Sequence, residues 1–245
     1  MNTVTRPAAI APLPVDRGSR RLSVTAGIGY LLSWLVGLLV FSSSTQVRSS
    51  GAQVLHSYTG HQSAVALQYV LTEGLPAMFL AAVVWTLART IAARAARARQ
   101  VVLAAGLAAA AVSLVQLTLG LWLSTGLVDE RATSTAGAVF DVLTRLDGIK
   151  MLLIAMLAVA AARAIRRRDV QLPAWLAHLA AALAVMITLS AIGYLALDNT
   201  LAAAAWASLP CLLVFITATG ITLHRRPTRQ ALRRSERYDP ARSSG

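Results

Sequence analysis

Six long apolar runs constrain the fold of this chain more than any other feature of its sequence. They cover residues 22–42, 64–88, 101–124, 143–162, 172–195 and 201–223. At a helical rise of about 1.5 Å per residue, each run can cross a hydrocarbon layer about 30 Å thick. Charged residues make up only 13% of the chain, against about 25% in soluble domains. The sequence therefore predicts an all-α fold, a polytopic membrane helix bundle with six transmembrane helices.

Arginine is distributed unevenly among the segments that join the runs. Four arginines precede the first run, four lie in the second connection, four in the fourth and seven after the last run. The other side, with the start of the fourth run, holds only Arg48, Arg131, Arg145 and Lys150. Because basic residues favour the cytoplasmic side, both termini are predicted to lie in the cytoplasm and the chain in the cytoplasmic (inner) membrane.

This distribution also explains the formal net charge of +13. Arginines beside a membrane span hold its topology and attract anionic lipid head groups. The predicted partners are therefore the lipid bilayer and anionic head groups at the arginine-rich cytoplasmic side, and the pattern argues against nucleic acid as a partner. The sequence does not determine the oligomeric state.

These boundaries divide the chain into three parts: a flexible cytoplasmic tail at 1–20, a six-helix transmembrane domain at 21–224 and a basic cytoplasmic tail at 225–245. On the outer side we expect loops at 43–63 and 125–144 and a tight turn at 198–200. None can hold a separate domain, so any chemistry must lie inside the bundle or at its outer mouth. Gly29, Ser33 and Gly37, at four-residue spacing, predict a packing face on the first helix.

Polar side chains from three runs fall at one level of the predicted bundle. Glu73, Gln116 and Asp147 lie 16 or 17 residues from the arginine at the cytoplasmic end of their runs. Lys150 lies 13 residues from that arginine. This spacing puts all four roughly 20 to 26 Å above the inner boundary, in the outer part of the hydrocarbon core. Intramembrane charge is costly and often functional.

Asp147 and Lys150 are three residues apart, so they share a helical face and can pair. Glu73 can neutralise the same lysine or share a proton, and Tyr69 lies one turn before it. Pro76 removes a backbone donor, which predicts a kink beside Glu73. The alternative is that these groups are a packing staple, with Gln116 as a hydrogen-bond partner, or that Lys150 extends to the outer interface.

Other residues give less specific signals. His178 is placed in the middle of the fifth run, where a histidine can be a haem ligand or proton carrier. A hydrogen-bonded packing role is favoured, because no second histidine lies at that depth. His56 and His61 have no third ligand nearby, and Cys211 is the single cysteine. We therefore predict no catalytic residue, no metal site and no cofactor, which favours a non-enzymatic role.

The first third of the chain also carries a resemblance. It reads "GIGYLLSWLVGLLVF" and then "SSGAQVLHSYTGHQSAVALQYVLTEGLPAMFLAAVVWTLAR", with Tyr58 and His61 in the outer "YTGH" segment. This part resembles the start of uncharacterised six-helix integral membrane proteins of high-GC actinobacteria. The resemblance implies architecture and location and assigns no activity.

The predicted function is small-solute binding or transport through a polar cavity in the outer half of the bundle. Its candidate ligand-binding residues are Glu73, Gln116, Asp147, Lys150 and Tyr69, and the expected ligand is a small molecule. The alternative is a non-enzymatic membrane regulatory or scaffold protein in which the polar layer only fixes helix packing. A third possibility, a membrane oxidoreductase, would require a bound chromophore.

Overall fold

Six helices long and apolar enough to cross a membrane make up the described part of this chain. The computed structural model describes residues 17–42 and 45–224, and these residues form no strand. The six spans, numbered in chain order, are Arg21–Val40, Gln62–Thr90, Ala93–Glu130, Thr133–Arg166, Ala174–Ala196 and Asn199–His224. This confirms the predicted all-α, six-span fold of a multi-pass membrane protein.

Several spans are built from more than one helical element. Span 1 belongs to α1 (Arg17–Val40), span 4 is α7 (Thr133–Arg166) and span 5 is α8 (Ala174–Ala196). Span 2 joins α3 (Gln62–Tyr69), the π-helical turn η1 (Val70–Gly74) and α4 (Leu75–Thr90). Span 3 joins η2 (Ala93–Ala95), α5 (Ala96–Trp122), the π-helical turn η3 (Leu123–Leu127) and α6 (Val128–Glu130). Span 6 joins α9 (Asn199–Ala202) and α10 (Ala205–His224), and α2 (Gly51–Tyr58) lies in the first outer loop.

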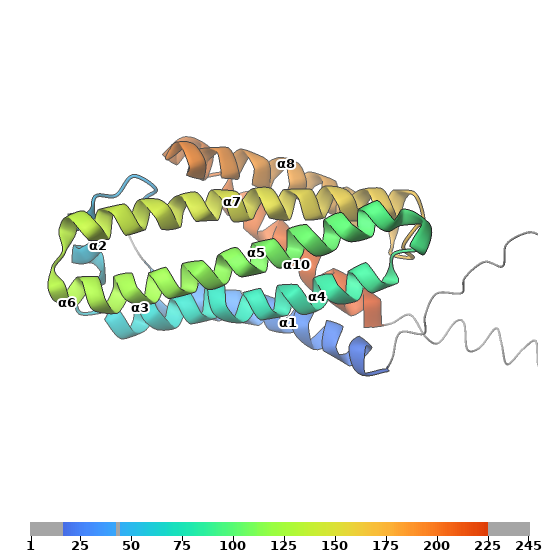
Figure 1. Cartoon of the computed structure of the whole chain (residues 1–245), viewed down its shortest axis with the longest axis horizontal. Helices are drawn as coiled ribbons and strands as arrows, with labels where there is room; N and C mark the ends of the chain where they lie inside the picture. The colour runs from blue at the N-terminus through green and yellow to red at the C-terminus, as the bar shows by residue number, and fades with distance from the viewer. Residues whose placement is uncertain (1–16, 43–44, 225–245) are drawn as a thin grey trace, which may run out of the picture.

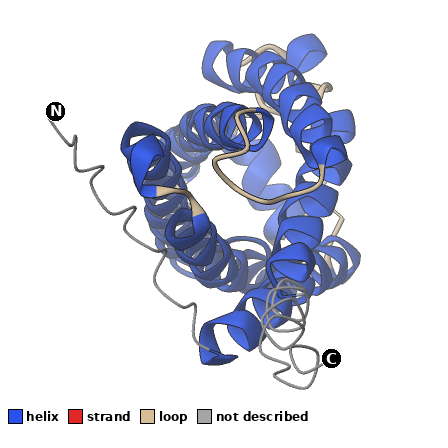
Figure 2. Cartoon of the chain, turned by 90° about the vertical axis from the view of Figure 1, so that its right-hand side faces the viewer, coloured by secondary structure: helices blue, strands red, loops and turns tan. Residues whose placement is uncertain are grey.

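The spans form a closed ring in chain order. Each packs mainly against the spans that precede and follow it, and α10 returns to pack against α1. Figure 2, which views the bundle along its length, shows the helices around a common axis. Short connections favour such antiparallel neighbours. Side chains that point toward the axis can therefore meet across the ring from spans that are not neighbours in sequence.

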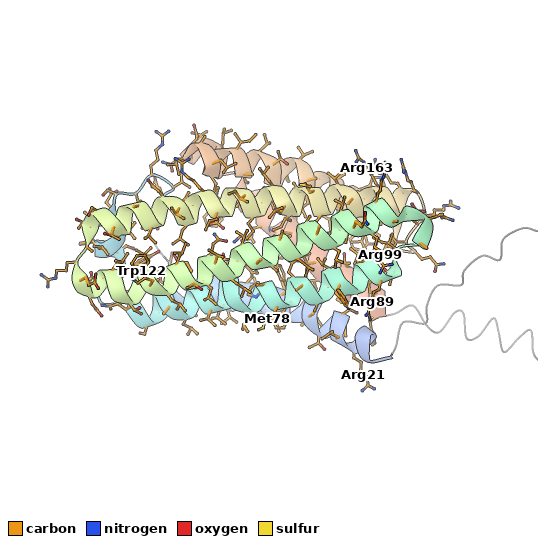
Figure 3. All side chains as sticks on the ribbon, viewed as in Figure 1. Arg21, Met78, Arg89, Arg99, Trp122 and Arg163 are labelled. Carbon is orange, nitrogen blue, oxygen red and sulfur yellow. The ribbon has the colours of Figure 1, made fainter. Side chains whose placement is uncertain are left out.

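The outside of the ring is apolar and has aromatic side chains near both ends. Trp85 and Trp175 are exposed at one end, and Trp122 and Trp206 are exposed toward the other. In Figure 3 the labelled arginines gather at the right-hand end of the bundle, opposite the end nearer Trp122. Exposed aliphatic side chains cover the surface between, as on a protein in contact with a lipid bilayer. We call the end opposite the arginines the outer end.

Small residues on one face of α1 bring it close to span 2. A Cβ atom on Gly29 would lie 2.6 Å from the Phe79 ring, and one on Gly37 would lie 2.6 Å from Thr72. Ser33 between them is buried and donates to the Tyr30 carbonyl of its own helix. The predicted packing face of the first helix is therefore confirmed, and it faces span 2.

The expected outer loop at 125–144 is wrong, because most of this segment is helical. Spans 3 and 4 continue outward through η3, α6 and the first ten residues of α7. Together with α2 and α3 they enclose a second apolar core, which includes Val54, Leu127 and Val139. We call this assembly the outer cap; in Figure 1 it lies at the left-hand end, beyond the end of α8. Exposed Asp129, Glu130 and Asp141 interrupt the apolar run here without interrupting the helices.

The first outer loop connects the cap to the far side of the ring. Arg48 donates through Nε to the carbonyl oxygen of Leu197, at the end of α8. Asn199 donates to the Gln46 side chain over 2.9 Å. Ser50 and Gln53 form a capping box that starts α2, whose Gly51 packs directly against α7. The loop is therefore held at both of its ends.

The ends of the described chain bear on the expected domain boundaries. Helix α1 begins at Arg17, inside the segment predicted as a flexible tail at 1–20, and α10 ends at His224. Residues 1–16 and the predicted basic tail at 225–245 lie outside the described residues.

Candidate functional site

Lys150 on span 4 is held by two carboxylates. Its ammonium Nζ lies 2.8 Å from both Oε1 and Oε2 of Glu73 on span 2. It also lies 2.8 Å from Oδ1 of Asp147, three residues earlier on α7. The structure thus shows the expected pairing of Asp147 with Lys150 and the expected neutralisation of Lys150 by Glu73. Because spans 2 and 4 are separated in the ring by span 3, this contact reaches across the bundle.

The three charged side chains differ in burial. Only 9% of the side-chain surface of Lys150, and of Glu73, is exposed. The ammonium therefore stays inside the bundle, and the interpretation that Lys150 extends to the outer interface is wrong. Asp147 keeps 31% of its side-chain surface exposed. It is the accessible member of the group.

The backbone of span 2 adopts a π-helical turn next to Pro76. Residues Val70–Gly74 form η1, and the N–H of Leu75 donates to the carbonyl of Val70. Span 2 thus stays helical through this region and carries a π turn at the place where a kink was expected, with Pro76 in the first turn of α4. Such turns recur at functional sites, because the added residue redirects a side chain. Glu73 lies within this turn and is buried.

Gln116 on α5 is fully buried and contacts span 4. Its Nε2 donates to the carbonyl oxygen of Leu143 over 3.3 Å. That acceptor fixes which end of the amide faces α7, because a flipped amide would put two oxygens together. Its Oε1 is buried and has no hydrogen-bond partner among the described residues. In α7 the carbonyl of Leu143 also accepts the backbone N–H of Asp147, so the amide of Gln116 lies beside the turn that leads into Asp147.

Tyr69 connects the charged group to the outer cap. Its ring packs where a Cβ on Gly120 of α5 would lie, 2.4 Å away. Its hydroxyl is 3.4 Å from that of Tyr58 on α2, and the side chain lies within electrostatic range of Asp147 and Glu73. Burial raises the pKa of the Tyr58 phenol above its ordinary value. Tyr58 therefore stays a neutral hydroxyl at the inner surface of the cap.

Sequence reasoning missed three residues of this arrangement. Tyr30 on α1 and Tyr194 on α8 lie close enough to Lys150 to interact with it electrostatically. The Ser113 hydroxyl on α5 lies beside the Glu73 carboxylate. Each is a lone hydroxyl in an apolar run, and such residues often only pack. The ring order was needed to place them together.

Five of the six spans therefore contribute to one interior group. We call it the polar centre, and it consists of Glu73, Asp147 and Lys150 with the surrounding Tyr30, Tyr69, Ser113, Gln116 and Tyr194. A separate surface depression of about 310 Å³ in the first outer loop is lined by Thr45, Gln46, Arg48, Ser49 and Gln53, none of which belongs to the polar centre.

The histidines lie outside the polar centre. His178 is exposed in the second turn of α8, because the chain between Arg168 and Pro173 is not helical and shifts the start of span 5. It is therefore neither at mid-span nor buried, and the expected packing role is wrong. His56 and His61 are exposed in the cap. Within residues 17–42 and 45–224, no three His, Cys, Asp or Glu side chains cluster in a way that suits a metal ion.

No protein-family model, no curated protein and no solved structure matches this chain.

Proposed function

We propose that this membrane protein binds a small polar solute at the polar centre and passes it between the centre and the outer side. The observation that carries this proposal is the position of Asp147. It lies on the stripe of α7 that points into the ring, yet 31% of its side-chain surface is exposed. An accessible charge inside a membrane bundle is what a solute site requires.

The direction of Asp147 follows from its neighbours on α7. Leu143, Lys150, Ile154 and Leu157 are buried and continue its stripe at alternating spacings of three and four residues. The opposite face of α7 carries exposed aliphatic residues, which are lipid-facing: Val142, Ile149, Met156 and Val159. Asp147 therefore lies on the interior side of α7, and a solute that reached it would meet the carboxylate before the buried Lys150.

Cysteine substitution tests this access. In a Cys211→Ala background, we expect Asp147→Cys to react with a charged, membrane-impermeant thiol reagent added from the outer side. Ile149→Cys is the matched control, because its side chain is equally near the outer side but faces lipid, where a charged reagent does not dissolve. Equal protection of both thiols would contradict a solute site. Reaction of both thiols would also contradict it, because the reagent would then reach the lipid-facing side of α7 as readily as the interior side.

The proposed location is the cytoplasmic membrane, with both termini in the cytoplasm. The support is the concentration of arginines at one end of the bundle, including Arg21, Arg89, Arg99 and Arg163 (Figure 3). Anionic lipid head groups are the proposed partners of this end. Reporter domains that are active on only one side of the membrane, fused after His224 and in the 129–132 turn, should give opposite signals. The same signal at both fusions would contradict this topology.

A second function is favoured by the geometry of Glu73. Both of its carboxylate oxygens contact Lys150, and both side chains are buried. Such a closed pair can serve only to fix the register of spans 2 and 4, as in a regulatory or scaffold protein. If the pair only fixes packing, the double change Glu73→Leu with Lys150→Met should leave the protein's function in the cell intact. If the polar centre binds a solute, the same variant should fold but lose its response to that solute.

A further inference from the structure

The charges of the polar centre do not balance. Two carboxylates, Glu73 and Asp147, face one ammonium, that of Lys150. The groups around them, from spans 1, 2, 3 and 5, are tyrosine hydroxyls, a serine hydroxyl and an amide, all neutral at ordinary pH. Arg145, two residues before Asp147, is exposed and lies off the interior stripe. The described centre therefore carries one net negative charge when both acids are ionised.

The ammonium of Lys150 is already neutralised from two sides. Its Nζ lies 2.8 Å from both oxygens of the Glu73 carboxylate and 2.8 Å from Oδ1 of Asp147, and only 9% of its side-chain surface is exposed. An incoming anion would have to displace one of these two carboxylates to reach it. A ligand that approached through its own carboxylate or phosphate would meet negative charge and no available positive group. This arrangement disfavours anionic solutes.

The atoms that remain available are acceptors. Lys150 pairs with Oδ1 of Asp147, and Oδ2 forms no ion pair with the described residues. Asp147 is also the accessible side chain of the group. Oε1 of Gln116 is buried without a hydrogen-bond partner among the described residues. The contact of Nε2 with the Leu143 carbonyl holds this amide beside the turn that leads into Asp147. A buried acceptor without a donor is costly, so Oε1 of Gln116 calls for a ligand that donates, and the accessible carboxylate of Asp147 can pair with a cation.

We propose that the polar centre binds a small protonated amine, with Asp147 supplying the counter-charge and Gln116 Oε1 accepting one of its N–H bonds. The inference deepens the proposed solute-binding function and rests on it. The half-buried rings of Tyr69 and Tyr194 lie within electrostatic range of Asp147, and aromatic rings also favour cations. The Lys150–Glu73 pair fixes the inner wall of this site and leaves Asp147 for the ligand.

The test measures ligand-induced thermal stabilisation of the full-length protein in lipid nanodiscs. The probes are methylammonium and ethylammonium chloride, with sodium chloride at the same ionic strength and sodium acetate as an anionic probe. We expect a saturable rise of the melting temperature with the amines alone. Asp147→Asn should weaken the apparent amine affinity by tenfold or more. Asp141→Asn, an exposed carboxylate on the same helix, should leave it unchanged.

Gln116 provides a second variant in case Asp147→Asn does not fold. Gln116→Leu should also weaken the amine response, whereas Thr118→Val, two residues along α5 and exposed, should not. An amine response that survives both Asp147→Asn and Gln116→Leu would overturn the inference, as would an equal response to sodium. A saturable response to acetate that Lys150→Met abolishes would overturn it while leaving the proposed solute-binding function in place. Failure of thiol access at residue 147 would instead remove that function.

Discussion

Two groups of ion-paired side chains join different spans of this bundle, and they lie in opposite surroundings. At the arginine-rich end, Arg94 in η2 contacts Asp169 after α7 over 2.8 Å, and 70% of the Arg94 side-chain surface is exposed, against 10% of that of Asp169. In the polar centre, Lys150 contacts Glu73 and Asp147 at the same distance, with 9% of its side-chain surface exposed. The contact distances are alike, and the surroundings determine what each pair does.

The difference concerns desolvation. Arg94 is the exposed partner of its pair, so solvent already screens the contact, and water can take the place of the guanidinium beside Asp169 when the arginine is removed. A buried pair has lost its water, so removing one partner leaves a charge that nothing compensates. The exposed Arg94–Asp169 pair can therefore assist the turn between spans at small cost. The polar centre is costly to keep, because its buried charges have lost their water, and this cost favours a functional role for it.

The largest expected effect is that of Lys150→Met. It leaves the buried carboxylate of Glu73 and the accessible carboxylate of Asp147 beside each other without a cation, and we expect a loss of about 3–5 kcal/mol in the free energy of unfolding. The measurement is reversible unfolding in detergent micelles, followed by helical circular dichroism. Adding Glu73→Leu to this variant should restore part of the loss. A loss below about 1 kcal/mol would mean that the centre behaves like an exposed pair.

A smaller and more informative contrast separates the two acids. Glu73→Gln removes a buried partner of Lys150, and we expect it to cost about 1–3 kcal/mol in the same unfolding measurement. Asp147→Asn leaves the Lys150–Glu73 pair intact and removes the surplus negative charge, so it should cost less than about 1 kcal/mol. Equal costs would show that the three groups act as a single staple and that Asp147 has no separate role.

Sequence patterns predicted most of the fold, because long apolar runs and one-sided arginines report directly on a membrane bundle. All six runs became helices. The helical extensions at 125–130 and 133–142 were missed, since exposed Asp129, Glu130 and Asp141 interrupted the apolar run while Val139 and Leu143 continued the buried face. In water above the membrane, a helix needs only one apolar face, which a search for uniform apolar runs does not detect.

The candidate site could be predicted in part. Counting residues from the flanking arginines brought Glu73, Asp147 and Lys150 to one level, because the rise of a helix is nearly constant. It could not identify Tyr30 or Tyr194, since their membership depends on the rotation of α1 and α8 in the ring. The π turn at Val70–Gly74 was not predicted either, because a proline such as Pro76 can follow a π turn or a simple kink and the sequence does not distinguish them.

At the exposed pair, Arg94→Ala should have a small effect. We expect a loss of less than about 1 kcal/mol in the free energy of unfolding, and a smaller loss at high salt, which weakens interactions of exposed charges. The matched variant is Arg97→Ala, which removes an exposed arginine two residues after η2. Unfolding of both variants at low and high salt is the measurement. A salt-independent loss at Arg94 would place this contact in the same class as the polar centre.

The smallest expected effect concerns Asp198, a partly exposed residue whose carboxylate pairs with the backbone. Its Oδ1 accepts from the N–H groups of Leu201 and Thr200 at the start of α9, and these bonds lower its pKa below the ordinary value. Because the pKa of Asp198 is lowered in the folded protein, its hydrogen bonds to the backbone stabilise the fold fully above the ordinary carboxyl pKa. This stabilisation is lost as the pH falls through the lowered pKa.

Amide hydrogen exchange at Thr200 and Leu201, corrected for intrinsic rates, should therefore show protection at neutral pH that declines only under strongly acidic conditions. Asp198→Asn keeps an acceptor oxygen and should retain protection without the pH dependence, whereas Asp198→Ala should lose protection at every pH. Protection in the unaltered protein that does not vary with pH would mean that the turn is held by its other contacts, such as that between Asn199 and Gln46. The exposed charges would then add even less to the fold than the comparison with the polar centre implies.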